Sequence, residues 1–128
     1  MKLTLTKKLT VIALIGLFSQ FSLAQDAGAA LKDIADIVVS LNHFPSDADK
    51  AKLMVIADNG DFPQGVRDMA TTVANISHSA NAEGKEAMAR IVANDQAPDR
   101  SKTLAGIIAD LNHMASADAK SSLGNLFP

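Results

Sequence analysis

Three histidines are the residues of this chain whose type and spacing best suit chemistry. His43, His78 and His113 are the only histidines in the sequence, and successive ones lie 35 residues apart. Imidazole is the commonest protein ligand for transition metals, and it suits zinc, copper and nickel. Histidines at equivalent places in a stacked repeat would form a row, and they would converge on one ion if the stack curved toward them. The spacing is therefore compatible with a metal site that uses all three histidines.

A structural role competes with this interpretation. A strong metal site usually has two ligands close in sequence, as in a helical H-x-x-x-H, whereas here each repeat contributes one histidine. Carboxylates nearby could complete a site, and they are Asp47, Asp49, Glu83 and Asp118. A histidine at the end of a helix can instead hydrogen-bond the last free carbonyl groups. We therefore expect the histidines to close helix ends, with metal binding as the alternative.

No catalytic site is expected. Ser46, His43 and Asp47 have the residue types of a nucleophilic triad. However, they lie within five residues of one another, whereas triad members usually converge from separate parts of a fold. Ser46 is better explained as the residue that caps a helix. We expect neither an enzyme nor a bound cofactor, apart from zinc, copper or nickel in the alternative.

The histidines lie in a block that the chain repeats three times. The copies are LNHFPSDADKAKL at 41–53, ISHSANAEGKEAM at 76–88 and LNHMASADAKSSL at 111–123. A regular period of this size is typical of helical hairpins that stack because one hairpin cannot bury its own apolar face. The period is similar to that of tetratricopeptide and related hairpin repeats. The chain has no Trp or Tyr, so that family's aromatic signature is missing and no functional residue is carried over.

Each repeat is predicted to open with one helix, called here its A helix. Apolar residues recur at the helical spacing i, i+3, i+4 and i+7. The three stripes are Leu31, Ile34, Ala35, Val38 and Leu41; Val66, Met69, Ala70, Val73 and Ile76; and Leu104, Ala105, Ile108 and Leu111. Pro63 and Pro98 are placed in the first turns of the second and third A helices, with Asp61 and Asp99 as their N-caps.

A second helix, the B helix, is predicted after each histidine corner. Ser46, Asn81 and Ser116 are favoured N-cap residues at equivalent positions. The inward-facing residues of the three B helices are predicted to be Leu53, Ile56 and Ala57; Met88, Ile91 and Val92; and Leu123, Leu126 and Phe127. Asn59-Gly60 and Asn94-Asp95 are expected to end the first two B helices, because these residues tolerate left-handed backbone.

The expected fold is all-α, with three tandem 35-residue helical hairpins, or six helices. They would form either a short α-solenoid or a compact up-down bundle. A single domain is predicted over 25–128, with repeats at 29–63, 64–98 and 99–128. The apolar end at 123–127 would either seal the core or provide a surface for oligomerisation.

The first 24 residues have the pattern of a secretory signal peptide. A basic start precedes an apolar run, and Ser22-Leu23-Ala24 forms a small-x-small cleavage site. Cleavage would place the protein in the periplasm or outside the cell, with no stable membrane span. After Ala24 there are nine basic and 14 acidic residues, a net charge of −5. This charge argues against a nucleic-acid partner, and the absence of Cys excludes disulfides and thiolate ligands.

Binding without catalysis is the leading functional hypothesis. Helical-hairpin arrays present faces and grooves to partners, and the sequence contains no polar cluster of a recognisable enzyme. We expect an exported interaction module for an envelope or extracellular protein, a peptide or an apolar ligand. Val39, Phe44, Phe62 and Met114 are apolar residues at stripe edges or in corners and are its candidate contact residues. A periplasmic metal-binding or metal-sensing protein that uses the three histidines is the alternative.

Overall fold

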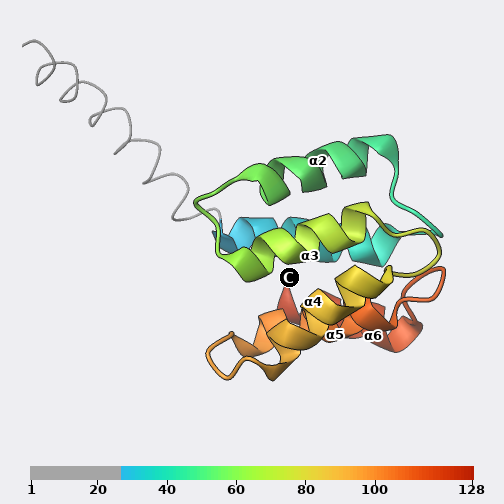
Figure 1. Cartoon of the computed structure of the whole chain (residues 1–128). Coiled ribbons are helices and arrows are strands. Elements are labelled where there is room, and N and C mark those ends of the chain that lie inside the picture. Colours follow the sequence, from blue (N-terminus) through green and yellow to red (C-terminus); the bar gives the residue numbers. More distant parts are fainter. Residues whose placement is uncertain (1–26) are drawn as a thin grey trace, which may run out of the picture.

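The protein is all-helical in the computed structural model, which describes residues 27–128. The predicted signal peptide at 1–24 lies outside the described residues. Six helices and no strands are present between residues 27 and 128 (Figure 1). Their bounds are 27–40 for the first helix, then α2 Asp47–Asp58, α3 Gln64–Ala74, α4 Ala82–Ala93, α5 Asp99–Asp110 and α6 Ala117–Leu126. The predicted fold class is therefore confirmed.

The A helices are the first helix, α3 and α5, and they supply most of the core. Every residue of the three predicted apolar stripes is buried. Leu41, Ile76 and Leu111, which follow the ends of these helices, are only 3 to 4% exposed. The core thus extends to the residue two positions before each histidine. The three histidine corners are anchored to one shared interior.

The B helices are α2, α4 and α6, and each begins at its predicted N-cap. The side chains of Ser46, Asn81 and Ser116 accept hydrogen bonds of 3.1, 2.7 and 3.1 Å from backbone N–H groups of the first turn. Most of the predicted inward residues are buried. Val92 is an exception at 46% exposed. It follows the buried Ile91 and therefore lies about 100° further round the helix, beyond the edge of the buried face.

Two predictions about helix ends are wrong. Pro63 and Pro98 are themselves the N-cap residues of α3 and α5, and neither helix has a side-chain cap from Asp61 or Asp99. Asn59 and Asn94 do end α2 and α4, but their φ angles are −83°, which is extended rather than left-handed backbone. Their side-chain oxygens instead accept backbone N–H groups two residues later, at 3.0 and 2.9 Å. Such Asx turns redirect the chain without a positive φ.

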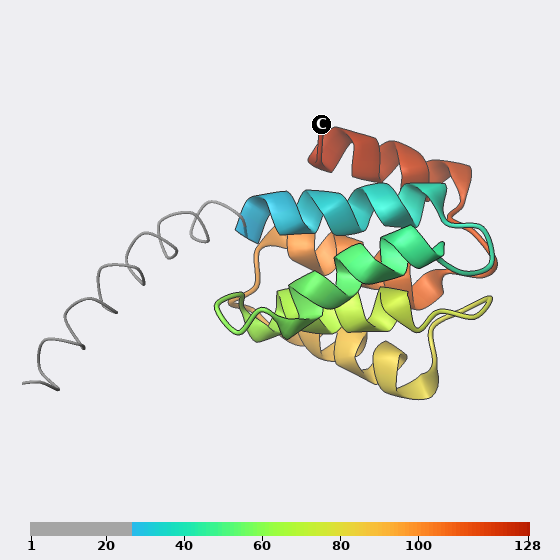
Figure 2. The same ribbon diagram turned by 90° about the horizontal axis from the view of Figure 1, so that it is seen from above.

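The three repeats form a closed arrangement in which the third repeat contacts the first. Each B helix packs on the A helix of the following repeat, so α2 contacts α3 and α4 contacts α5. Figure 2 shows α6, the B helix of the last repeat, alongside the first helix. A backbone hydrogen bond also joins the histidine corner of the third repeat to that of the first. An open solenoid keeps its first and third repeats apart, so the observed arrangement is the compact one of the two expected.

The C-terminal apolar end seals the core. Leu123 is 1% and Phe127 5% exposed, so these two side chains do not form an open apolar surface. Oligomerisation through this end stays a prediction that the structure does not test. Within residues 27–128, no helix has both the length and the apolar character needed to cross a membrane.

Candidate metal centre at the three histidine corners

Each histidine occupies an unusual backbone conformation. The φ angles of His43, His78 and His113 are 70°, 72° and 72°, and these are the only positive values among the non-glycine residues described. At the first corner the N–H of Phe44 also donates to the carbonyl of Asn42 at 2.8 Å, which together with the positive φ is the pattern of a classic γ-turn. Glycine would adopt a positive φ at lower cost. A histidine in all three copies therefore points to a use for the imidazole.

A closed ring of backbone hydrogen bonds joins the three corners. The N–H of His43 donates to the carbonyl of His113 at 2.5 Å, that of His78 to His43 at 2.6 Å, and that of His113 to His78 at 2.6 Å. Each histidine therefore donates one bond and accepts one. This ring satisfies backbone groups that would otherwise depend on solvent. It also places the three Cα atoms around one axis.

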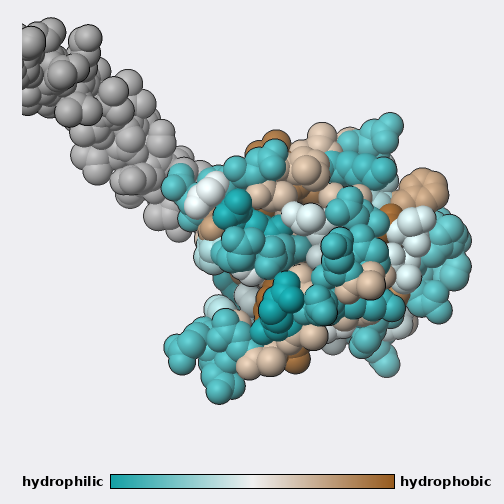
Figure 3. Space-filling model, viewed as in Figure 1, coloured by the Kyte–Doolittle hydropathy of each residue, from teal (hydrophilic) through white to brown (hydrophobic). Residues whose placement is uncertain are grey.

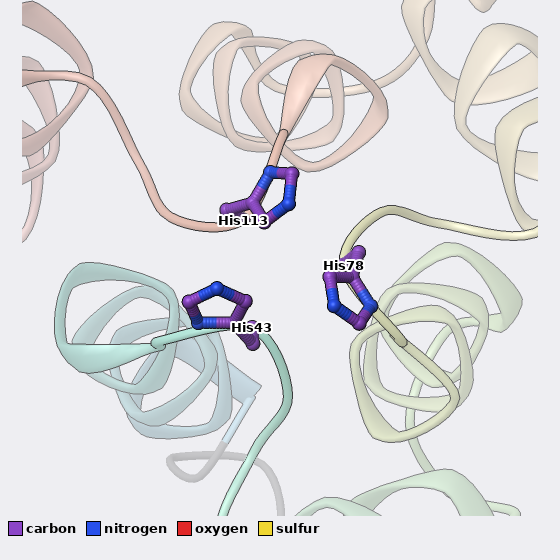
Figure 4. Close-up of side chains that lie close together, drawn as sticks. All are labelled: His43, His78 and His113. Carbon is purple, nitrogen blue, oxygen red and sulfur yellow. The ribbon is translucent and has the colours of Figure 1, made fainter.

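The imidazole rings face one another around this axis (Figure 4). Their centroids are 4.9 to 5.2 Å apart, and each pair of rings is nearly perpendicular, at 86 to 89°. One nitrogen of each ring lies within 4.8 Å of one nitrogen of each other ring. Residues that are 35 and 70 positions apart in sequence thus present three nitrogen donors to a single small volume.

Two of the rings are oriented by the residue that precedes them. Nδ1 of His43 lies 2.6 Å from Oδ1 of Asn42, and Nδ1 of His113 lies 2.7 Å from Oδ1 of Asn112. An amide oxygen is an acceptor, so each Nδ1 carries the proton and donates it. When such a ring is neutral, its lone pair is on Nε2, where a metal can bind. Ser77 takes the equivalent place before His78, and no such bond is present there.

The cluster is accessible from solvent. His78 and His113 are exposed, and His43 is half-buried. Phe44 and Met114, which follow two of the histidines, are 58% and 45% exposed. Figure 3 shows polar residues over most of one face of the molecule, with apolar residues in smaller separate areas. An ion or a small ligand could therefore reach the histidines without any helix having to move.

The structure differs from several expectations for this region. The imidazoles hydrogen-bond neighbouring asparagines, and no bond from an imidazole to a terminal helix carbonyl is present among the described residues. The positive φ explains this, because it turns the side chain away from the helix end and toward the axis. The four carboxylates expected to complete a metal site do not belong to the group of possible ligands, which consists of the three histidines alone.

The four candidate contact residues differ in how exposed their side chains are. Phe44 and Met114 are exposed as expected, whereas Phe62 is only 8% exposed and belongs to the core. Val39 is half-buried and packs against the core. Asn42 and Asn112 were not expected to take part in the site. The signal for them was present in the sequence, because asparagine precedes histidine in two of the three copies.

The three histidine corners together form one candidate metal centre. Three imidazole nitrogens form an open cluster at one end of the helical array, and two of the rings hydrogen-bond asparagine side chains. No protein-family model, no curated protein and no solved structure matches the chain.

Proposed function

We propose that the protein binds a transition-metal ion, namely zinc, copper or nickel, through His43, His78 and His113. The observation that carries the proposal is the convergence of three imidazole nitrogens within 4.8 Å of one another. Nitrogen donors of this kind suit these three metals. The hydrogen bonds from Nδ1 of His43 to Asn42 and from Nδ1 of His113 to Asn112 add support, because metal-binding histidines usually donate their other N–H to a neighbouring oxygen.

The geometry requires only a small closure of the cluster. Zinc–nitrogen bonds are about 2.0 to 2.1 Å long, so nitrogens around a tetrahedral ion lie roughly 3.4 Å apart. The nitrogens here are up to 4.8 Å apart. Rotation of the exposed rings of His78 and His113 can shorten these distances, while the backbone ring of hydrogen bonds keeps the corners in place.

Three protein ligands leave a fourth position open to water or to a donor from another molecule. The group of possible metal ligands among residues 27–128 consists of the three histidines alone. We propose binding, transport or sensing of the ion as the role of this site.

Contacts between the rings offer a purely structural explanation of the cluster. Edge-to-face aromatic pairs each contribute about 0.5 to 1.5 kcal/mol, and all three ring pairs have this geometry. An experiment must therefore measure metal binding itself and not only the stability of the protein.

Calorimetric titration of the purified, chelator-treated protein with zinc, copper and nickel tests the proposal. We expect one ion per chain with a dissociation constant of about micromolar or tighter for at least one metal. The variant with all three histidines changed to alanine should lose this binding. The matched control is Asp47→Asn with Asp118→Asn, which removes nearby exposed carboxylates and should retain it. Absence of binding tighter than about micromolar, or unchanged binding in the triple variant, would rule out the site.

A non-catalytic interaction module in the cell envelope is the second candidate function. The exposed side chains of Phe44 and Met114 support it, because they flank the histidines on the accessible end of the molecule. Crosslinking in the native envelope should capture a protein or peptide that is lost when both residues are changed to serine. Repeated recovery of no partner, or of the same partner from the double variant, would argue against this function.

A further inference from the structure

A second feature lies at the other end of the A helices. A cavity of about 470 Å³ is formed where these helices begin, and all three repeats line it. Leu31, Val66, Met69 and Ile91 provide apolar surface, and Arg100 and Ser101 provide polar groups. The histidine corners follow the opposite ends of the same helices, so this cavity is separate from the proposed metal site. Its volume is within the range of small-molecule sites.

The third repeat breaks the repeat pattern at this cavity. Leu31, Val66 and Ser101 are one period apart, and all three are buried and line it. Ala30, Gly65 and Arg100 form a second equivalent set. A hydroxyl and a guanidinium therefore replace apolar or small side chains in one copy only. Packing of the core does not require this change, since the other two copies fill the same positions with apolar or small residues.

The hydroxyl of Ser101 is a second polar group on the wall of the cavity. Ser101 is 6% exposed and lines the cavity, where most of its neighbours are apolar or small. A carboxylate bound there would be in position to accept a hydrogen bond from this hydroxyl.

Arg100 adds a positive charge to the lining of this cavity. The guanidinium of Arg100 lies over the ring of Phe127, 5.4 Å from its centroid, and the salt bridges among the described residues do not include it. Arg100 and Ser101 lie in the first turn of α5, whose N-cap Pro98 provides no side-chain cap. The free N–H groups of such a turn attract anions. Asp99, the acidic residue of this turn, is exposed and does not line the cavity.

We infer that this cavity binds a small carboxylic acid with an apolar body, such as a medium-chain fatty acid. The carboxylate would accept hydrogen bonds from Arg100, from the Ser101 hydroxyl and from the first turn of α5. Charge-assisted bonds of this kind are among the strongest in proteins. The hydrocarbon body would lie against Leu31, Val66 and Met69. The inference is independent of metal binding, because it uses none of the histidines.

Titration with three probes that share one hydrocarbon chain tests the inference. Octanoate, 1-octanol and octylamine are added to the purified protein in the presence of a chelator, and binding is measured by calorimetry and by NMR. We expect octanoate to bind one per chain, 1-octanol to bind about tenfold or more weakly, and octylamine to bind most weakly. Equal affinity for all three probes, or no binding of octanoate, would overturn the inference.

Two variants locate the site. Arg100→Gln should weaken octanoate binding about tenfold or more while leaving 1-octanol binding nearly unchanged. Ser101→Val introduces the residue that occupies the equivalent position at 66, so it should fold normally and also weaken octanoate binding. The matched control is Arg90→Gln, which removes an exposed arginine on α4 and should not change the affinity. Unchanged octanoate binding in Arg100→Gln would contradict the inference.

Discussion

The backbone N–H of His43 donates a 2.5 Å hydrogen bond to the carbonyl oxygen of His113, two repeat periods later in the chain. This bond joins the first corner to the last and completes the ring around the imidazoles. The nitrogen donors are therefore brought together only when all three repeats are folded. Any ligand that binds the three rings should stabilise the whole fold, because the unfolded chain does not hold this arrangement.

Metal should accordingly raise the melting temperature. At a free concentration of about 100 times its dissociation constant, a ligand that binds only the folded state adds roughly 2.7 kcal/mol to the free energy of unfolding. We expect thermal unfolding, followed by circular dichroism, to shift upward with the bound metal and to return to its starting value after chelation. Magnesium is the control, because it prefers oxygen ligands. An equal shift in the triple alanine variant would contradict the assignment.

The positive φ of His78 leads to a reversed order of stability between two substitutions. His78→Gly and His78→Ala both remove the imidazole, but only glycine adopts φ 72° without strain. We expect the glycine variant to be the more stable by about 1 kcal/mol. At the exposed helical position Ala89 the order is the usual one, and Ala89→Gly should cost about 1 kcal/mol. Urea unfolding measures both pairs, and an alanine variant at 78 more stable than the glycine variant would contradict the backbone assignment.

The asparagines should tune metal affinity. Asn42→Ala removes the acceptor for Nδ1 of His43, and loss of such a partner typically weakens metal binding about 10- to 100-fold. Ser77→Asn should have the opposite effect, because it introduces at the second corner the residue found at the other two. Calorimetry checks both variants. A gain from Asn42→Ala, or a loss from Ser77→Asn in a folded protein, would show that these contacts do not orient the ligands.

The corner residues of the core should be intolerant of charge. Leu41→Asp, Ile76→Asp and Leu111→Asp each place a carboxylate at a site that is 3 to 4% exposed. Each should cost several kcal/mol in the free energy of unfolding or prevent folding. Val55→Asp on α2 is the control, since Val55 is 70% exposed, and it should change stability by less than about 1 kcal/mol. Denaturant unfolding that shows similar stabilities for all four variants would mean that the buried side has been misidentified.

Replacing two glycines by alanine should change the stability of the protein in opposite directions. A Cβ atom at Gly84 would lie 2.7 Å from Cγ2 of the buried Thr72, so Gly84→Ala should lose about 1 to 3 kcal/mol through overcrowding. Gly124 in α6 has nothing within 4 Å of the same position. Gly124→Ala should therefore gain up to about 1 kcal/mol from helix propensity. The two melting temperatures decide the matter, and a stabilising Gly84→Ala would contradict the close packing of α3 on α4.

The helices could be predicted because their signals are local. The stripe from Leu31 to Leu41 recurs twice, and residues at this spacing share one face of a helix whatever the rest of the chain does. The caps Ser46, Asn81 and Ser116 act within one turn, so they were also predictable. Val92 and Phe62 were assigned wrongly because their burial depends on the edge of a contact between helices. Helical spacing does not determine where such an edge lies.

The site could be predicted only in part. The common period of the three histidines indicated that they occupy equivalent places. It did not indicate whether the repeats stack openly or close. Closure depends on contacts such as the one between His43 and His113, which no local pattern encodes. The positive φ was equally hidden, because glycine is the residue that usually marks such backbone and none is present at the three corners.

Closure also bears on what one repeat can do by itself. The first two B helices, α2 and α4, pack on the A helix of the following repeat, so a single hairpin would lack the partner that covers its B helix. In the full chain the last B helix, α6, lies alongside the first helix, so the sequence of contacts is closed. Arg100 lies near both ends of the described fold, Gly28 and Phe127. Three separate copies of one hairpin could satisfy the same contacts with true threefold symmetry. The fold therefore resembles a trimer of hairpins joined in one chain. Because the three repeats are encoded separately, each can change by itself, as Ser101 differs from the equivalent Leu31 and Val66.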